Sequence, residues 1–128
     1  MVDLRSVLKK QLIECDESCK RIVIKGTGIS PYVAKGPARI IRDEKSLEYI
    51  KEGEVVVLIN STPLMVPYLM KAVGLVGESK GYLNHLAIVS REFEKACVNG
   101  IPEVTKIVDD GDIIEVDGIE GIVRVEKK

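Results

Sequence analysis

The run Val55 to Ile59 is the longest uninterrupted aliphatic stretch in the chain, and it is rich in β-branched side chains. A short continuous run of this kind predicts a strand that is buried on both faces, as in the centre of a parallel sheet. It is far too short to cross a membrane. The segment 54–59 therefore constrains the fold more than any other, because it needs covering layers on both sides.

The segments around this run predict alternating strands and helices. Strands are expected before and after it, at 21–26, 37–43, 73–78 and 96–100. Helices are expected at 3–14 (extending to about residue 19), 46–53, 61–73 and within 81–93. This order of elements favours an α/β domain with some parallel pairing and a separate antiparallel part.

Prolines and glycines refine this reading. Pro63 suits the first position of its helix, and Pro67 is expected to kink or delay that helix. Near the C-terminus, Asp110-Gly111 and Asp117-Gly118 are turn signals between alternating runs. They predict a terminal β-hairpin.

Composition narrows the class of protein. The chain has 128 residues, which suits a single domain, and its net charge is −1. Without a basic surplus, we expect neither a nucleic acid nor a membrane as partner. The first residues lack the apolar block of a signal peptide, so a cytoplasmic protein is expected. Three cysteines without a Cys-x-x-Cys pair predict neither a disulfide framework nor a zinc site.

Common catalytic motifs are missing from the sequence. There is no phosphate-binding P-loop, and the Gly26-x-Gly28 pair is followed by Pro31 rather than by a third glycine. A single histidine does not supply a multi-histidine metal site, and the acidic turn 109–112 lacks the full calcium-loop spacing. No metal site is therefore expected, and His85 remains as the candidate.

His85 is predicted in the first turn of a helix that Asn84 caps. Free N–H groups and the helix dipole favour an anion at that end, and they disfavour a charged imidazolium. A neutral imidazole is a nucleophile, and a phosphoryl group added to it would carry negative charge to a favourable place. An ordinary surface or capping histidine remains the alternative from this local pattern.

The stretch GYLNHLAIVSREF (81–93) resembles the phosphohistidine motif of the phosphoenolpyruvate-utilising enzymes. These are phosphoenolpyruvate synthase, pyruvate phosphate dikinase and enzyme I of the sugar phosphotransferase system. Their motif is roughly Gly-Gly-x-Thr-Ser/Cys-His-x-Ala/Ser-Ile-x-Ala-Arg. The matching positions are Gly81, His85, Ala87, Ile88 and Arg91. Lys80, Leu83 and Asn84 depart from the motif.

The resemblance covers residues from about 21 to 125. KGTGISPYVAKGPARII looks like the family's opening, and DDGDIIEVDGIEGIVRV looks like its closing hairpin. It implies the swivelling β/β/α fold, a mixed sheet with flanking helices and a C-terminal β-hairpin. We accordingly expect an N-terminal helix extension at 1–20 and a phosphohistidine swivelling domain at 21–128.

The function that the resemblance implies is a stand-alone phosphocarrier, a phosphotransferase component that acts only with partner chains. His85 is then the phosphoryl acceptor, and Lys80, Gly81, Asn84 and Arg91 lie near the phosphate. No cofactor is expected on this chain. The Mg-dependent phosphoryl donor, ATP or phosphoenolpyruvate, is expected on a separate nucleotide-binding or phosphoenolpyruvate/pyruvate-binding protein. A non-catalytic binding or regulatory module with the same fold, and a structural subunit, are the alternatives.

Overall fold

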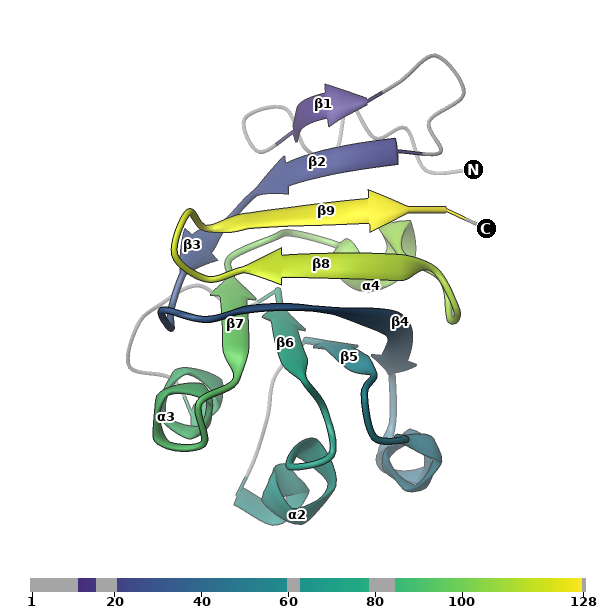
Figure 1. Ribbon diagram of the computed structural model, residues 1–128. Coiled ribbons are helices and arrows are strands. Elements are labelled where there is room, and N and C mark those ends of the chain that lie inside the picture. Colours follow the sequence, from purple (N-terminus) through teal and green to yellow (C-terminus); the bar gives the residue numbers. More distant parts are fainter. Residues whose placement is uncertain (1–11, 16–20, 60–62, 79–84, 128) are drawn as a thin grey trace.

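The computed structural model describes residues 12–15, 21–59, 63–78 and 85–127. In these residues nine strands follow the order β1-β2-β9-β8-β4-β5-β6-β7-β3 (Figure 1). The strands are β1 (Leu12–Cys15), β2 (Arg21–Lys25), β3 (Thr27–Gly28), β4 (Val33–Ile41), β5 (Val55–Leu58), β6 (Gly74–Gly77), β7 (Ala96–Asn99), β8 (Ile113–Asp117) and β9 (Ile122–Glu126). The helices are the 3₁₀ helices η1 (Glu44–Tyr49) and η2 (Pro63–Met65), and α2 (Val66–Leu69), α3 (His85–Glu92) and α4 (Val104–Ile107).

Strand β4 is shared between two layers of strands. Its first half, from Val33 to Pro37, pairs with β8 in the antiparallel sense. Its second half, from Ala38 to Ile41, pairs with β5 in the parallel sense. Strands β2, β9 and β8 therefore run across the direction of β5, β6 and β7 (Figure 1). One long strand thus joins an antiparallel layer to a parallel one.

The central run is buried on both faces, as predicted. Val55 and Val57 belong to the core between the two layers of strands, together with residues of β2, β8 and β9. Val56 and Leu58 belong to a second core, where the parallel layer meets the helices. All four side chains are at most 1% exposed. Successive side chains of β5 thus point into two different cores, one on each face of the strand. Two layers of strands and one layer of helices result, which is the expected β/β/α layering.

The parallel and antiparallel parts also match the prediction. β5, β6 and β7 pair in parallel, and the connections between them carry η2 with α2, and then α3. β8 and β9 form the terminal hairpin. At the turn of that hairpin, a Cβ on Gly118 would collide with the backbone carbonyl of Ser30. Glycine is required there because two stretches of backbone approach each other closely.

The predicted N-terminal helix is wrong over residues 12–15. These residues form β1, which pairs with β2 so that Leu12 faces Ile24 and Cys15 faces Ile22. Pairing satisfies backbone groups along one side of β2, and this tertiary gain outweighs the helical pattern of the local sequence. Residues 12–15 thus extend the sheet of the domain. The remainder of the expected helix lies outside the described residues.

Smaller differences concern the helices. The segment expected as a helix at 46–53 forms η1, which begins earlier because the Asp43 carboxylate accepts from the Ser46 backbone N–H at 3.0 Å. Near Pro67 the chain forms η2 first and then α2, in line with the predicted delay. α4 and β3 were not predicted. None of the helices in the described part of the chain is long and apolar enough to span a membrane.

Candidate functional site

His85 is the first residue of α3, the helix that follows the parallel strand β6. The predicted place of His85, in the first turn of a helix, is therefore confirmed. In a sheet of parallel strands, a connecting helix begins on the side where the preceding strand ends, and this is where ligands of such sheets bind. Lys80, Gly81 and Asn84, the expected neighbours of the phosphate, lie outside the described residues.

The helix that carries His85 is fixed by its buried face. Ala87 and Ser90 are fully buried and Val89 is 5% exposed, and the helix packs on β6 and β7. Ile88, by contrast, is 50% exposed. The buried face therefore fixes the position of α3 on the sheet, whereas the Ile88 side chain is half-exposed.

Arg91 ties the second half of α3 to the loop between β3 and β4. Its Nε donates to the carbonyl oxygen of Ile29 at 3.0 Å. The N–H of Ile29 in turn donates to the Cys97 carbonyl at 3.0 Å, and the Ser30 hydroxyl donates to the carbonyl of Lys95. Hydrogen bonds thus join the loop at Ile29 and Ser30 to α3 and to the start of β7. The role of Arg91 close to a phosphate stays a prediction.

Glu78 holds the end of β6, where the chain departs toward His85. Its carboxylate accepts from the hydroxyl of Thr105 at 2.6 Å and from the N–H of Thr105 at 3.0 Å. Arg42, which follows β4, donates to the carbonyl of Thr105 at 2.7 Å. The sequence did not predict this cluster. A carboxylate directly after a buried strand was the available signal, but nothing local points to Thr105.

Cys97 lies in the core beside α3 and is fully buried. Burial raises the pKa of this thiol to about 12, against smaller opposing effects of a hydrogen bond with Ser90 and the charge of Arg91. A thiol with such a pKa stays protonated at neutral pH and is a poor nucleophile. Cys97 therefore acts as a small apolar core residue, and His85 remains the candidate nucleophile.

Comparison with known proteins places this geometry in a family. Residues 50–121 match the family model for the mobile domain of PEP-utilising enzymes. The match includes β5, β6, α3 and β8, and hence His85, Arg91 and Glu78. The chain belongs to this family of mobile domains. The expected resemblance to this family is thereby confirmed.

Individual relatives agree with the family. A probable phosphoenolpyruvate synthase of Archaeoglobus fulgidus is 37% identical over 131 residues, which cover 96% of this mobile domain and 17% of the relative. An uncharacterized phosphotransferase of Bacillus subtilis is 36% identical over 110 residues, covering 86% of the domain and 13% of the relative. The chain thus spans about a sixth or less of the length of these relatives.

Solved structures support the fold. An NMR structure of Enzyme I aligns with a TM-score of 0.55 and 33% identity, and covers 64% of this mobile domain and 34% of that chain. A crystal structure of Thermococcus kodakaraensis aconitase X aligns with a TM-score of 0.61 at 16% identity. That second match covers 80% of the domain and 97% of the other chain, and it concerns the fold alone.

Proposed function

We propose that this mobile domain is a phosphocarrier in which His85 accepts a phosphoryl group from a donor and passes it on. The observation that carries the proposal is the place of His85, at the first residue of α3, in a member of the PEP-utilising family. The phosphoenolpyruvate synthase and phosphotransferase names of the relatives support the same chemistry.

The transfer step uses the neutral imidazole of His85. A ring nitrogen of His85 attacks the phosphorus of the donor, and a P–N bond forms while the P–O bond to the leaving group breaks. The leaving oxygen keeps the electron pair of that bond, and the other ring nitrogen releases its proton to solvent. The reverse sequence, with a different acceptor, returns His85 to its starting state.

Local structure supports a charged intermediate at this position. α3 runs from His85 to Glu92, so the N–H groups of its first turn have no partners within the helix. These groups and the helix dipole stabilise the oxygens of a phosphoryl group on the first residue. We propose that Lys80, Gly81, Asn84 and Arg91 add donors around it.

The proposal assigns the donor and the acceptor to other units. An Mg-dependent donor, ATP or phosphoenolpyruvate, binds to a nucleotide-binding or phosphoenolpyruvate/pyruvate-binding partner chain, and this domain carries only the phosphoryl group. The buried Ala87 and the hydrogen bond from Arg91 to Ile29 hold α3 in place, so His85 would keep its position in the domain while the domain moves between partners.

A second candidate is a binding or regulatory module without phosphotransfer. Lys80, Leu83 and Asn84 depart from the phosphohistidine motif of the family, and this departure favours the second candidate. In that case His85 is a surface residue, and its replacement leaves the function of the module unchanged.

A labelling experiment tests the carrier function. Extract of the source organism, freed of small molecules, is incubated with the purified chain and with labelled phosphoenolpyruvate or labelled ATP. Phosphohistidine is stable in alkali and labile in acid, so the label on the wild-type chain should show both properties, and His85→Ala should remain unlabelled. Equal labelling of both chains, or no acid-labile label with either donor, would support the binding module instead.

A further inference from the structure

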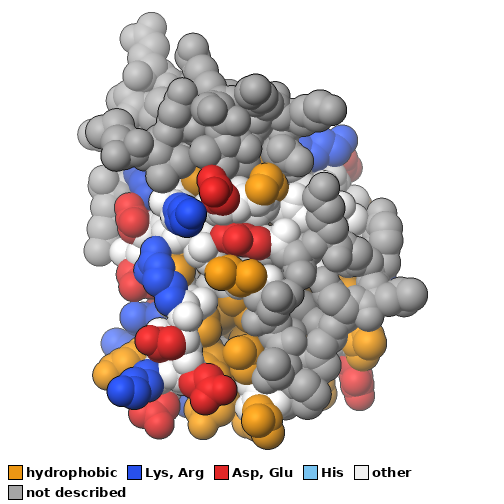
Figure 2. Space-filling view, turned by 180° about the vertical axis from the view of Figure 1, so that it is seen from behind, with side chains coloured by type: hydrophobic (Ala, Val, Ile, Leu, Met, Phe, Trp, Pro, Cys, Tyr) orange, Lys and Arg blue, Asp and Glu red, His pale blue; other side chains and the backbone are white. Residues whose placement is uncertain are grey.

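The exposed apolar side chains of the described residues are unevenly distributed. Nine large hydrophobic residues are exposed, and seven of them lie on the connections that follow β4, β5 and β6. These seven are Tyr49, Ile59, Leu64, Tyr68, Met70, Ile88 and Phe93. Figure 2 shows hydrophobic side chains gathered in the lower half of the molecule, the half that α2 and α3 occupy in Figure 1. Among the described residues, the helical layer thus carries most of the exposed apolar side chains.

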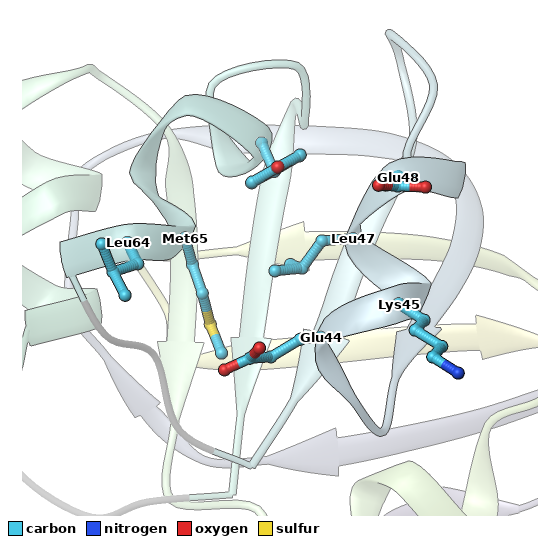
Figure 3. A pocket seen from close by; sticks show the side chains of 7 residues that line it. Glu44, Lys45, Leu47, Glu48, Leu64 and Met65 are labelled. Atoms are coloured by element: carbon cyan, nitrogen blue, oxygen red, sulfur yellow. The ribbon is translucent and has the colours of Figure 1, made fainter.

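A groove of about 440 Å³ lies in this layer, between η1 on one side and η2 with α2 on the other. Leu47 and Met65 line its inner part, and both belong to or pack on the core beneath the helices. Leu64, which is 82% exposed, and Tyr68, which is 37% exposed, line its outer part. Figure 3 shows Leu47 and Met65 approaching the hollow from its two sides. An apolar side chain of a partner would find apolar contacts on both sides.

The charge of the rim is negative. The charged residues that line the groove are Glu44, Glu48 and Lys45, and Glu44 points toward Met65 while Lys45 points away from it (Figure 3). The segment 43–52, which includes η1, carries four carboxylates and two lysines. A hydrogen bond from Ser46 lowers the pKa of the Asp43 carboxyl, so it stays ionised at neutral pH. The groove therefore suits an apolar side chain that is flanked by lysine or arginine.

The groove shares a layer with the candidate site. The segments that line it follow β4 and β5, and His85 begins the helix after β6, the next strand in the sheet. All three connections start at the carboxyl ends of parallel strands. On α3, Ile88 lies three residues after His85, hence on the same helical face, and is half-exposed. A protein that meets His85 would therefore face this apolar layer.

From these observations we propose that the groove of η1, η2 and α2 is a docking site for the partner protein that exchanges phosphoryl groups with His85. The docking segment of that partner inserts an apolar side chain between Leu47, Leu64 and Met65, and places basic side chains against Glu44 and Glu48. The partner thereby holds the domain at a point separate from the reacting imidazole. The role of the groove in phosphoryl transfer rests on the carrier function proposed above. Binding of a peptide to the groove can be measured without any transfer.

Binding is tested with two synthetic helical peptides and the full chain. Both peptides carry the same row of leucines, flanked by lysines in one and by glutamates in the other. Methyl NMR should show that the lysine peptide shifts the signals of Leu64 and Met65 and leaves that of Ile119 in place, and that the glutamate peptide shifts none. Equal binding of both peptides, or shifts of equal size at Ile119, would overturn the proposal.

Three variants sharpen this measurement. Leu64→Ser should weaken binding of the lysine peptide about tenfold, through lost apolar burial. Glu48→Lys should weaken it about threefold, since an exposed ion pair contributes little. Ile119→Ser is the matched control, because Ile119 is also an exposed aliphatic residue, at 65%, but lies in the turn of the β8–β9 hairpin. Unchanged affinity of Leu64→Ser would contradict the docking site.

The same variants connect docking to transfer. In the extract assay, Leu64→Ser should take label from the donor more slowly than wild type and Ile119→Ser. With phosphoramidate, a small donor that needs no docking, the rates of all three chains should agree. Equal rates in the extract would overturn the role of the groove in transfer. If wild type takes no label in the extract while the peptide result holds, the carrier function fails and the docking site stands.

Discussion

At the scale of single residues, the buried ion pair of Arg39 with Glu54 is a sensitive point. Nε and Nη2 of Arg39 donate to the two carboxylate oxygens at 3.2 and 3.0 Å, and the Lys51 N–H donates to the same carboxylate at 2.6 Å. The Glu54 side chain is 8% exposed and that of Arg39 24%. The pair therefore places a charge where water cannot fully solvate it.

We expect Arg39→Ala to lower the free energy of unfolding by about 2–3 kcal/mol, because it leaves the Glu54 carboxylate buried and without its cation. The estimate is below that for a fully buried pair, since Arg39 is partly solvated. Urea denaturation measures the change. Arg39→Leu combined with Glu54→Leu should be less destabilised than Arg39→Ala, and a double variant that is worse would contradict this explanation.

The thiol of Cys97 provides a second residue-scale prediction. Burial raises the pKa of Cys97 to about 12, so below that pH the folded protein carries the thiol rather than the thiolate. Iodoacetamide at mildly alkaline pH should leave Cys97 unmodified in the folded chain and alkylate it once urea unfolds the chain. Peptide mapping by mass spectrometry follows the residue, and rapid alkylation without urea would show that the core around it opens.

At the scale of elements, β4 joins the two layers at a glycine. An ideal Cβ on Gly36 would collide with the backbone carbonyl of Gly53, so the backbones of two segments approach each other there. Gly36 lies in the half of β4 that pairs with β8, just before the half that pairs with β5. The close approach of these two segments therefore requires glycine, which has no Cβ, at position 36.

Gly36→Ala should accordingly destabilise the domain by about 1–3 kcal/mol, the usual cost of overpacking. Gly74→Ala is the matched control in another strand, because the nearest atom to its Cβ would be a Val116 methyl at 3.3 Å, which moves more easily than backbone. Thermal unfolding followed by circular dichroism compares the two variants. A larger loss for Gly74→Ala would contradict the proposed close approach.

The elements that the sequence predicted are those with a strong local cause. The run Val55 to Leu58 is buried because its own side chains require two cores, and α3 begins at His85, where the apolar period begins. β1 was missed because its pairing with β2 is a long-range gain. The bond of Glu78 with Thr105 and the groove between η1 and α2 also join segments distant in sequence. No local pattern encodes such contacts.

At the scale of the whole molecule, the domain has one layered architecture with His85 at the start of a crossover helix. Its relatives are several times longer, and this chain covers 17% of the Archaeoglobus fulgidus protein. In the proposed carrier function, this domain supplies His85 as the nucleophile, and the donor site is assigned to another unit. The layered architecture and the family thus both agree with the proposal that this domain carries a phosphoryl group.

This division of labour predicts that residues 1–128 alone have no turnover. Purified chain mixed with phosphoenolpyruvate or ATP and Mg²⁺ should yield no steady formation of pyruvate or ADP, because no unit binds and activates the donor. Coupled spectrophotometric assays detect either product. Sustained release from the wild-type chain, absent from a His85→Ala chain, would show that the donor site lies within these residues.

The most direct test of the central claim is the state of His85 in the cell. The chain is purified from its own organism under alkaline conditions without phosphatase, and its intact mass and phosphorus NMR spectrum are recorded. We expect a fraction with the mass of one added phosphoryl group and a phosphoramidate signal that disappears in acid. Neither should be present in a His85→Ala strain whose protein is still folded. A chain without any acid-labile phosphoryl group, or with one that persists in His85→Ala, would contradict the phosphocarrier function.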